Sequence, residues 1–151
     1  MSMTPEKFMA FPGEIEDCLY ERSAKLVLKS GVPEDLYSRP ISQHLPLIAS
    51  ELIDNCVDKG AKNVFLTITP NSMVIEDDFV EQNPEKVLEL LSKIKSSHKW
   101  VTTKDKQRKE AGCATDGGMG IFQTMNTLKL FEGDLNYYIV DQKIVAEVTW
   151  K

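Results

Sequence analysis

The sequence has few cysteines and few histidines, which excludes the commonest metal and disulfide architectures. Its 151 residues include three cysteines and two histidines, and no two cysteines stand in a C-x-x-C pattern. A structural zinc site usually needs four such ligands, and a disulfide framework needs paired cysteines. We therefore expect reduced thiols, as in a cytoplasmic protein.

Long apolar segments and an excess of positive charge are also lacking. There is no run of about 18 apolar residues, and the segment from Met1 to Phe11 lacks the charged-then-apolar pattern of a secretion signal. Lys and Arg total 18 against 23 Asp and Glu, which gives a net charge of −5. These features predict a cytoplasmic protein that binds neither membranes nor nucleic acid.

Hydrophobic periodicity predicts helices and strands in an order typical of a two-layer α/β sandwich. Apolar residues at helical spacing predict helices over 14–30, from Pro46 to Gly60, after Asn83-Pro84 and from Gly120 to about Gly133. Alternating patterns predict strands over 62–69, 73–75, 135–139 and 144–150, with a hairpin turn at Asp141-Gln142. We expect one α+β domain over 1–151, with helices on one face of a mainly antiparallel sheet.

The segment 96–116 has almost no periodicity and is unusually long for a passive connection. Six of the chain's 18 basic residues fall within it or directly before it, namely Lys95, Lys99, Lys104, Lys106, Arg108 and Lys109. We expect either a lid that meets the negative charge of a triphosphate or a solvated loop without a specific partner.

Glu51 and Asn55 are four residues apart, so a helix presents both on one face. A carboxylate and a carboxamide placed together can position a water molecule and bind a magnesium ion through oxygen. The alternative interpretation is the solvated polar face of an amphipathic helix.

Two further segments carry polar or glycine-rich patterns that suit a nucleotide. Asp77 ends a hydrophobic strand, where its carboxylate could accept a hydrogen bond from an exocyclic amine such as that of adenine. Gly117-Gly118-Met119-Gly120 opens a helix, where free amides and the helix dipole favour a phosphate. Each segment also has a simpler explanation, as an acidic turn and as ordinary turn chemistry.

The order of these segments resembles that of the GHKL, or histidine-kinase-like, ATPases, whose structure is the Bergerat fold. The string from Leu47 to Ala61, which contains E-L-I-D-N-x-x-D-x-G-A, is similar to the family's N-box and is followed directly by a strand. Ile75-Glu76-Asp77-Asp78 resembles the start of the G1 box, and Gly117 to Ile121 resembles the G2 box. The resemblance covers roughly Leu47 to Trp150.

This resemblance implies ATP and Mg²⁺ as ligands and gives a role to each matching residue. Asn55 would bind the magnesium ion, and Asp77 would accept the adenine amino group. The G2 segment Gly117-Gly118-Met119-Gly120 would meet the phosphates through the amides of Gly118 and Gly120. Glu51 matches the position of the general base in ATPase branches of the family, and of the group that assists phosphoryl transfer in kinase branches.

The G1 segment departs from the family pattern. The family has D-x-G-x-G, but here the residues are Asp77-Asp78-Phe79-Val80-Glu81, so both glycines are replaced. A phenylalanine at position 79 would either crowd the pocket or stack beside the base.

The resemblance favours a stand-alone domain that acts on a partner protein, as anti-sigma-factor kinases do. We expect either an ATP-dependent regulatory protein kinase or switch, or a module that regulates its partner without phosphoryl transfer. An ATPase subunit whose transducer domain lies on another chain is a third alternative. The first helix, over 14–30, is the surface that we expect a partner or a second copy in a homodimer to use.

Overall fold

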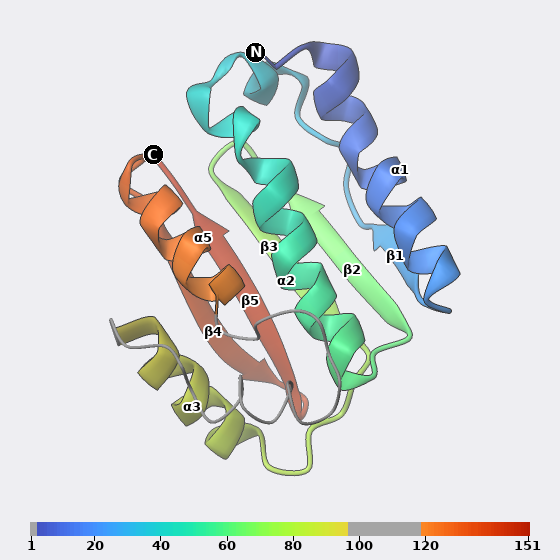
Figure 1. Ribbon diagram of the computed structural model, residues 1–151, viewed down its shortest axis with the longest axis vertical. Coiled ribbons are helices and arrows are strands. Elements are labelled where there is room, and N and C mark those ends of the chain that lie inside the picture. Colours follow the sequence, from blue (N-terminus) through green and yellow to red (C-terminus); the bar gives the residue numbers. More distant parts are fainter. Residues whose placement is uncertain (1–2, 97–118) are drawn as a thin grey trace.

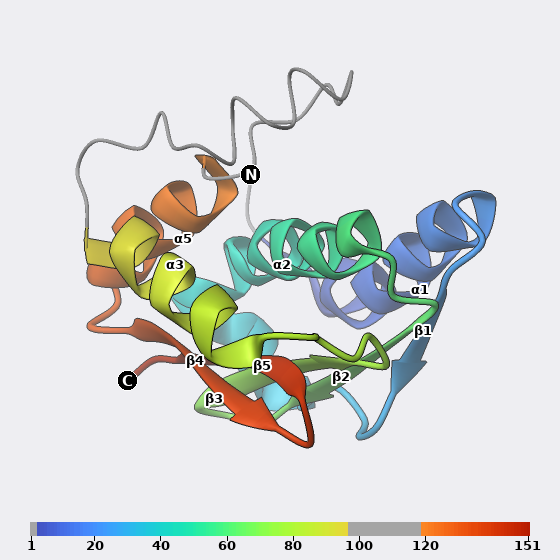
Figure 2. The ribbon, with the colours of Figure 1, turned by 90° about the horizontal axis from the view of Figure 1, so that it is seen from below.

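The computed structural model describes residues 3–96 and 119–151, which form a five-stranded sheet with helices packed on one face (Figure 1). The helices are α1 (Pro5–Glu21), α2 (Leu45–Lys59), α3 (Pro84–Ser96) and α5 (Met119–Lys129), and two short 3₁₀ helices span Glu34–Ser38 and Pro40–Gln43. The strands are β1 (Lys25–Leu28), β2 (Asn63–Ile68), β3 (Ser72–Asp77), β4 (Asp134–Val140) and β5 (Lys143–Thr149). Figure 2 shows the four labelled helices on the same side of the sheet, which confirms the predicted α+β sandwich.

The sheet has the strand order β1-β2-β3-β5-β4 and is mixed. Strand β1 pairs with β2 in parallel, and the other neighbouring strands are antiparallel. Leu66 lies opposite Ile75, which in turn lies opposite Ala146. These three side chains are buried, so this register places one continuous apolar row beneath the helices.

The prediction of a helix over 14–30 is wrong at both ends. Helix α1 begins at Pro5, where the Thr4 hydroxyl accepts a hydrogen bond from the Lys7 amide, and it continues through Pro12 to Glu21. Lys25–Leu28 is a short edge strand instead of the last turn of that helix. Its four residues fit either period, and only pairing with β2, almost forty residues further along the chain, selects the strand.

Helix α2 lies across the sheet and ends as the sequence predicts. Gly60 has a φ of 118°, and its amide donates back into the last turn of the helix. This left-handed conformation suits glycine and stops the helix. The buried stripe of α2 faces the core and consists of Leu45, Ile48, Ala49, Leu52, Ile53 and Cys56.

The remaining elements follow their predicted positions closely. Helix α3 begins at Pro84, and α5 ends at Lys129, a turn before the expected Gly133. Asp141 and Gln142 both have positive φ, as a two-residue hairpin turn between antiparallel strands requires. The expected lid at 96–116 lies outside the described residues, apart from the end of α3. Among the described residues, no helix is long and apolar enough to cross a membrane.

The close approach at Gly133 gives a stability prediction. A β-carbon at Gly133 would overlap the backbone carbonyl oxygen of Thr149, so we expect Gly133→Ala to destabilise the fold by about 1–3 kcal/mol. The control is Gly13→Ala in α1, where a β-carbon meets nothing within 4 Å. This control should stabilise the protein by roughly 0.5–1 kcal/mol, because alanine is the better helix former. Urea denaturation measures both, and equal stability of the two variants would contradict the prediction.

Candidate nucleotide site

Glu51 and Asn55 lie one turn apart on α2, both half-buried. Neither side chain makes a hydrogen bond to another residue that the structure describes. Burial, with a smaller contribution from the neighbouring charge of Asp54, raises the pKa of the Glu51 carboxyl above its usual value. The two residues therefore present oxygen atoms with free acceptor capacity on one side of the helix.

Gly120, in the first turn of α5, packs directly against Glu51. Gly120 is buried, and a β-carbon there would overlap the Glu51 carboxylate oxygen Oε2. The start of the glycine-led helix and the polar face of α2 are thus in contact, although they are almost seventy residues apart in the sequence. Gly117 and Gly118 lie outside the described residues, and Met119 is the first residue of α5.

Asp77 is buried at the end of β3, and its two carboxylate oxygens differ in their bonding. Oδ1 accepts a hydrogen bond of 2.9 Å from the amide of Phe79. Oδ2 is buried without any well-directed hydrogen bond. It lies 3.0 Å from Lys59 Nζ, which is the distance of an ion pair. The ammonium group is therefore the charged partner of Oδ2, although the contact lacks the geometry of a directed hydrogen bond.

The surroundings of Asp77 include a buried thiol. Burial, followed by the nearby charge of Asp77, raises the pKa of the Cys56 thiol well above its usual range. Cys56 therefore stays protonated at neutral pH, as a neutral thiol beside the Asp77 carboxylate.

Phe79 replaces the first glycine of the family's G1 motif, and its ring lies on the end of α2. Two of its ring carbons are 3.4 and 3.6 Å from the position that a β-carbon of Gly60 would take. The Lys59 ammonium group stands 5.6 Å from the centre of the same ring, within the range of a cation–π interaction. Phe79 therefore packs against the end of α2 beside Asp77, where it is held by contacts on two sides.

Lys59 and Glu81 are site residues that the sequence did not single out. Lys59 Nζ lies between two carboxylates, 3.0 Å from Asp77 Oδ2 and 3.5 Å from Glu81 Oε1. The sequence feature that could have indicated Lys59 is its place in the N-box string, directly before the glycine that ends the helix. The structure shows that Lys59 faces the end of β3. In the sequence, Glu81 stands out only because it replaces the second glycine of the G1 pattern.

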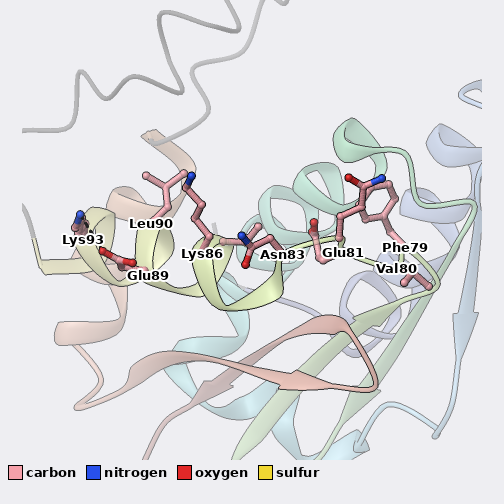
Figure 3. Close-up of a pocket in the computed structure, with 10 residues that line it drawn as sticks. Phe79, Val80, Glu81, Asn83, Lys86, Glu89, Leu90 and Lys93 are labelled. Carbon is pink, nitrogen blue, oxygen red and sulfur yellow. Dashed lines mark ion pairs between the residues drawn. The ribbon is translucent and has the colours of Figure 1, made fainter.

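A cavity of about 760 Å³ adjoins this cluster. Phe79 and Glu81 belong to both, and Figure 3 shows these residues together with Lys86 and Leu90 along the loop after β3 and on α3. The other residues that line it are Val80, Gln82, Asn83, Val87, Glu89 and Lys93. The described residues that line it all come from 79–93, so Glu51, Asn55 and Asp77 lie outside it.

The end of α1 is tied to α2 by ion pairs. Arg22 pairs with Asp54 at 2.8 Å, and its other terminal nitrogen pairs with Asp58. These two aspartates lie beside Glu51 and Asn55 on the helix. The positive charge of Arg22 at the end of α1 therefore offsets the negative charge of the two aspartates beside the candidate site.

No group of three or more metal-binding side chains (histidine, cysteine, aspartate or glutamate) occurs in the part of the chain that the structure describes. A magnesium ion held by one protein side chain and by phosphate oxygens would not need such a group. Asn55, with its unused oxygen, fits that arrangement.

Comparisons with known proteins identify the fold. No protein-family model and no curated protein sequence matches the chain. Among solved structures, the catalytic domain of the histidine kinase ThkA matches with a TM-score of 0.58 and 12% identity, over 99% of this chain and 95% of that one. The histidine kinase domain of the blue-light activated kinase EL346 from Erythrobacter litoralis matches with a TM-score of 0.52 and 11% identity, over 99% of this chain.

A second structure of the EL346 kinase gives a TM-score of 0.51 and 12% identity, over 95% of this chain. The chain spans 64% of the first EL346 structure and 41% of the second. The chain therefore has the fold of histidine kinase catalytic domains, as the sequence resemblance implied. At this level of identity the likeness concerns the fold alone.

The raised pKa of Glu51 gives a pH-dependent prediction. The folded state disfavours the charged carboxylate, so ionised Glu51 lowers the free energy of unfolding. This loss of stability is absent at a pH below the ordinary pKa of glutamate and complete at a pH above the raised pKa of Glu51. Glu51→Gln should therefore stabilise the protein at pH 7, by less than about 1 kcal/mol because solvent screens a half-buried group, and the gain should vanish at about pH 4.

Urea denaturation at both pH values measures this difference. The exposed Glu14 of α1 provides the control, since Glu14→Gln makes the same change in net charge away from α2. A gain in Glu51→Gln that persists unchanged at the lower pH would contradict the electrostatic cause.

Proposed function

We propose that this chain binds Mg-ATP between α2, the start of α5 and the end of β3, and acts in the cytoplasm as a regulatory protein kinase or nucleotide switch on a partner protein. The observation that carries the proposal is the carboxylate of Asp77, which is completely buried at the end of β3 and whose Oδ2 has an ion pair with Lys59 but no well-directed hydrogen bond. It lies where the sequence resemblance places the acceptor for the adenine amino group. A charged side chain that is completely buried is uncommon away from functional sites, which supports a role for Asp77 in binding.

The other residues fit the phosphate end of the same ligand. Asn55 would hold the magnesium ion, which when bound neutralises and aligns the phosphates. Gly120 allows the first turn of α5 to pack against Glu51, and we propose that the amides at this helix start meet a phosphate. We include Gly117, Gly118 and Met119 in the phosphate-binding segment on the resemblance alone.

Glu51 is the residue that we propose as general base. Its raised pKa brings the carboxyl nearer to neutral pH, which makes it a better proton acceptor than an exposed glutamate. Its contact with Gly120 places it where α2 meets the phosphate-binding helix. It would orient a water molecule or a substrate hydroxyl and take the proton released on attack.

A second candidate function is a regulatory module that has lost phosphoryl transfer. It is favoured by Phe79 and Glu81, which replace both glycines of the G1 motif, and by the complete burial of the Asp77 side chain. Such a module would bind its partner with or without nucleotide and would not consume ATP.

Titration calorimetry with ATP and magnesium tests the binding site. We expect wild-type protein to bind, and Asn55→Ala to weaken binding at least about tenfold, because the metal loses its protein ligand. Asn126→Ala removes an exposed asparagine of α5 and should bind like the wild type. Leaving out magnesium should reproduce the Asn55→Ala effect. No heat from the wild-type protein at millimolar ATP would reject the proposed function.

Turnover distinguishes the two candidate functions. If Glu51 is the general base, Glu51→Gln should slow hydrolysis or transfer by about 10²–10⁴-fold while ATP binding persists. The rate of phosphate release, or of transfer to a partner, is the measurement. Binding without any turnover in the wild-type protein would favour the inactive module, and equal rates in both proteins would remove Glu51 from the mechanism.

A further inference from the structure

The carboxylate proposed to receive the base is occupied by a side chain of the protein itself. We propose that Lys59 controls nucleotide affinity by holding Asp77 in the empty protein and moving to Glu81 when a base amino group binds. This inference rests on the proposed function, since it concerns the affinity of the same site.

Asp77 is closed to a ligand in the described structure. Its side chain has 0% exposure, and Oδ1 is engaged by the Phe79 amide. Oδ2 is the remaining acceptor, and Lys59 Nζ stands 3.0 Å from it. An incoming amine that donates to Oδ2 must therefore take the place that the ammonium group now holds.

Lys59 already pairs with a second carboxylate, so a small movement would release Asp77 while the pair with Glu81 remains. Its ammonium group lies 3.5 Å from Glu81 Oε1, and the Phe79 ring stands beside it. Lys59 remains 27% exposed and Glu81 12% exposed, so the alternative pair is less deeply buried than the first. Because lysine has a long flexible stem and a compact charge, rotation of its side chain is enough to exchange the two carboxylates.

This exchange explains the two residues that depart from the G1 motif. Glu81 supplies the alternative carboxylate, and Phe79 supplies an aromatic face within cation–π distance of the ammonium group. Glycine at either position would offer neither contact. Phe79 and Glu81, which replace the two glycines, thus provide the contacts that hold Lys59 when it leaves Asp77.

The consequence for binding is a population effect. If only the state with Lys59 on Glu81 admits the base, the apparent affinity is reduced by the fraction of molecules in that state. A variant without the ammonium group should bind more tightly, and a variant that lacks the alternative carboxylate should bind more weakly. A lysine that simply attracts phosphate would give the opposite result when removed.

The first test compares Lys59→Met with Lys62→Met by calorimetry. Lys62 is exposed and lies three residues further along the chain, so its substitution makes the same change in charge close to the site. We expect Lys59→Met to bind ATP about two- to fivefold more tightly than Lys62→Met, the range for losing one partly exposed ion pair. Adenosine should show the same gain, since it carries no phosphates.

A purine riboside without the exocyclic amine serves as the ligand control. It cannot donate an amino hydrogen to Asp77 Oδ2, so its affinity should change less than that of adenosine between the two lysine variants. An equal gain for both nucleosides would overturn the assignment of Oδ2 as the contested acceptor.

Glu81→Gln keeps the inference testable if Lys59→Met fails to fold. Glu81 also donates its backbone amide to the carbonyl of Gln142, and this hydrogen bond is retained in the variant. With its alternative partner neutral, Lys59 should remain on Asp77, and ATP and adenosine should bind about two- to fivefold more weakly than to the wild type. Circular dichroism and urea denaturation establish that each variant is folded.

The outcomes separate this inference from the proposed function. Tighter binding by Lys59→Met or weaker binding by Glu81→Gln, each relative to its comparison protein, supports it. Wild-type binding with weaker or unchanged affinity in Lys59→Met overturns the inference and leaves the proposed function intact. Absence of binding in all the proteins overturns both.

Discussion

The packing of α2 on the sheet is the constraint on which the rest of the structure depends. Its apolar stripe, which includes Leu52 and Ile53, is almost completely buried against the strands. Burying that face fixes the rotation of the helix, because side chains three and four residues apart share one direction. Glu51 and Asn55 are thereby directed away from the core, toward the side on which α5 begins. The same rotation brings Lys59, at the end of the helix, to the end of β3.

The candidate site combines features that would be costly in a protein without a ligand. A buried carboxylate, an oxygen without a directed donor and a glutamate with a raised pKa all reduce stability when they serve no purpose. All three features lie around one helix, α2, and the proposed nucleotide would account for them together. The proposed phosphoryl transfer would depend mainly on positioning and electrostatics, so it would need few groups.

The sequence predicted elements best where local chemistry acts alone. Gly60 ends α2 through its left-handed backbone, and Asp141-Gln142 forms a tight hairpin turn, because each depends on its own residues. Prediction failed at Lys25–Leu28, where partners distant in the sequence make the decision. Four residues are too few to show whether the hydrophobic period is that of a strand or of a helix end. The stabilisation that comes from pairing with β2 cannot be inferred from these four residues alone.

By itself, the sequence determined the sandwich fold, the N-box helix with Glu51 and Asn55, and the place of Asp77 at a strand end. Periodicity and the order of motifs carry this information, since both are properties of the chain alone. Only the tertiary structure decided that Gly120 meets Glu51, that Phe79 packs on Gly60, and that Lys59 stands between Asp77 and Glu81. These contacts join segments of separate elements, and their geometry depends on how α2, α5 and the end of β3 pack together.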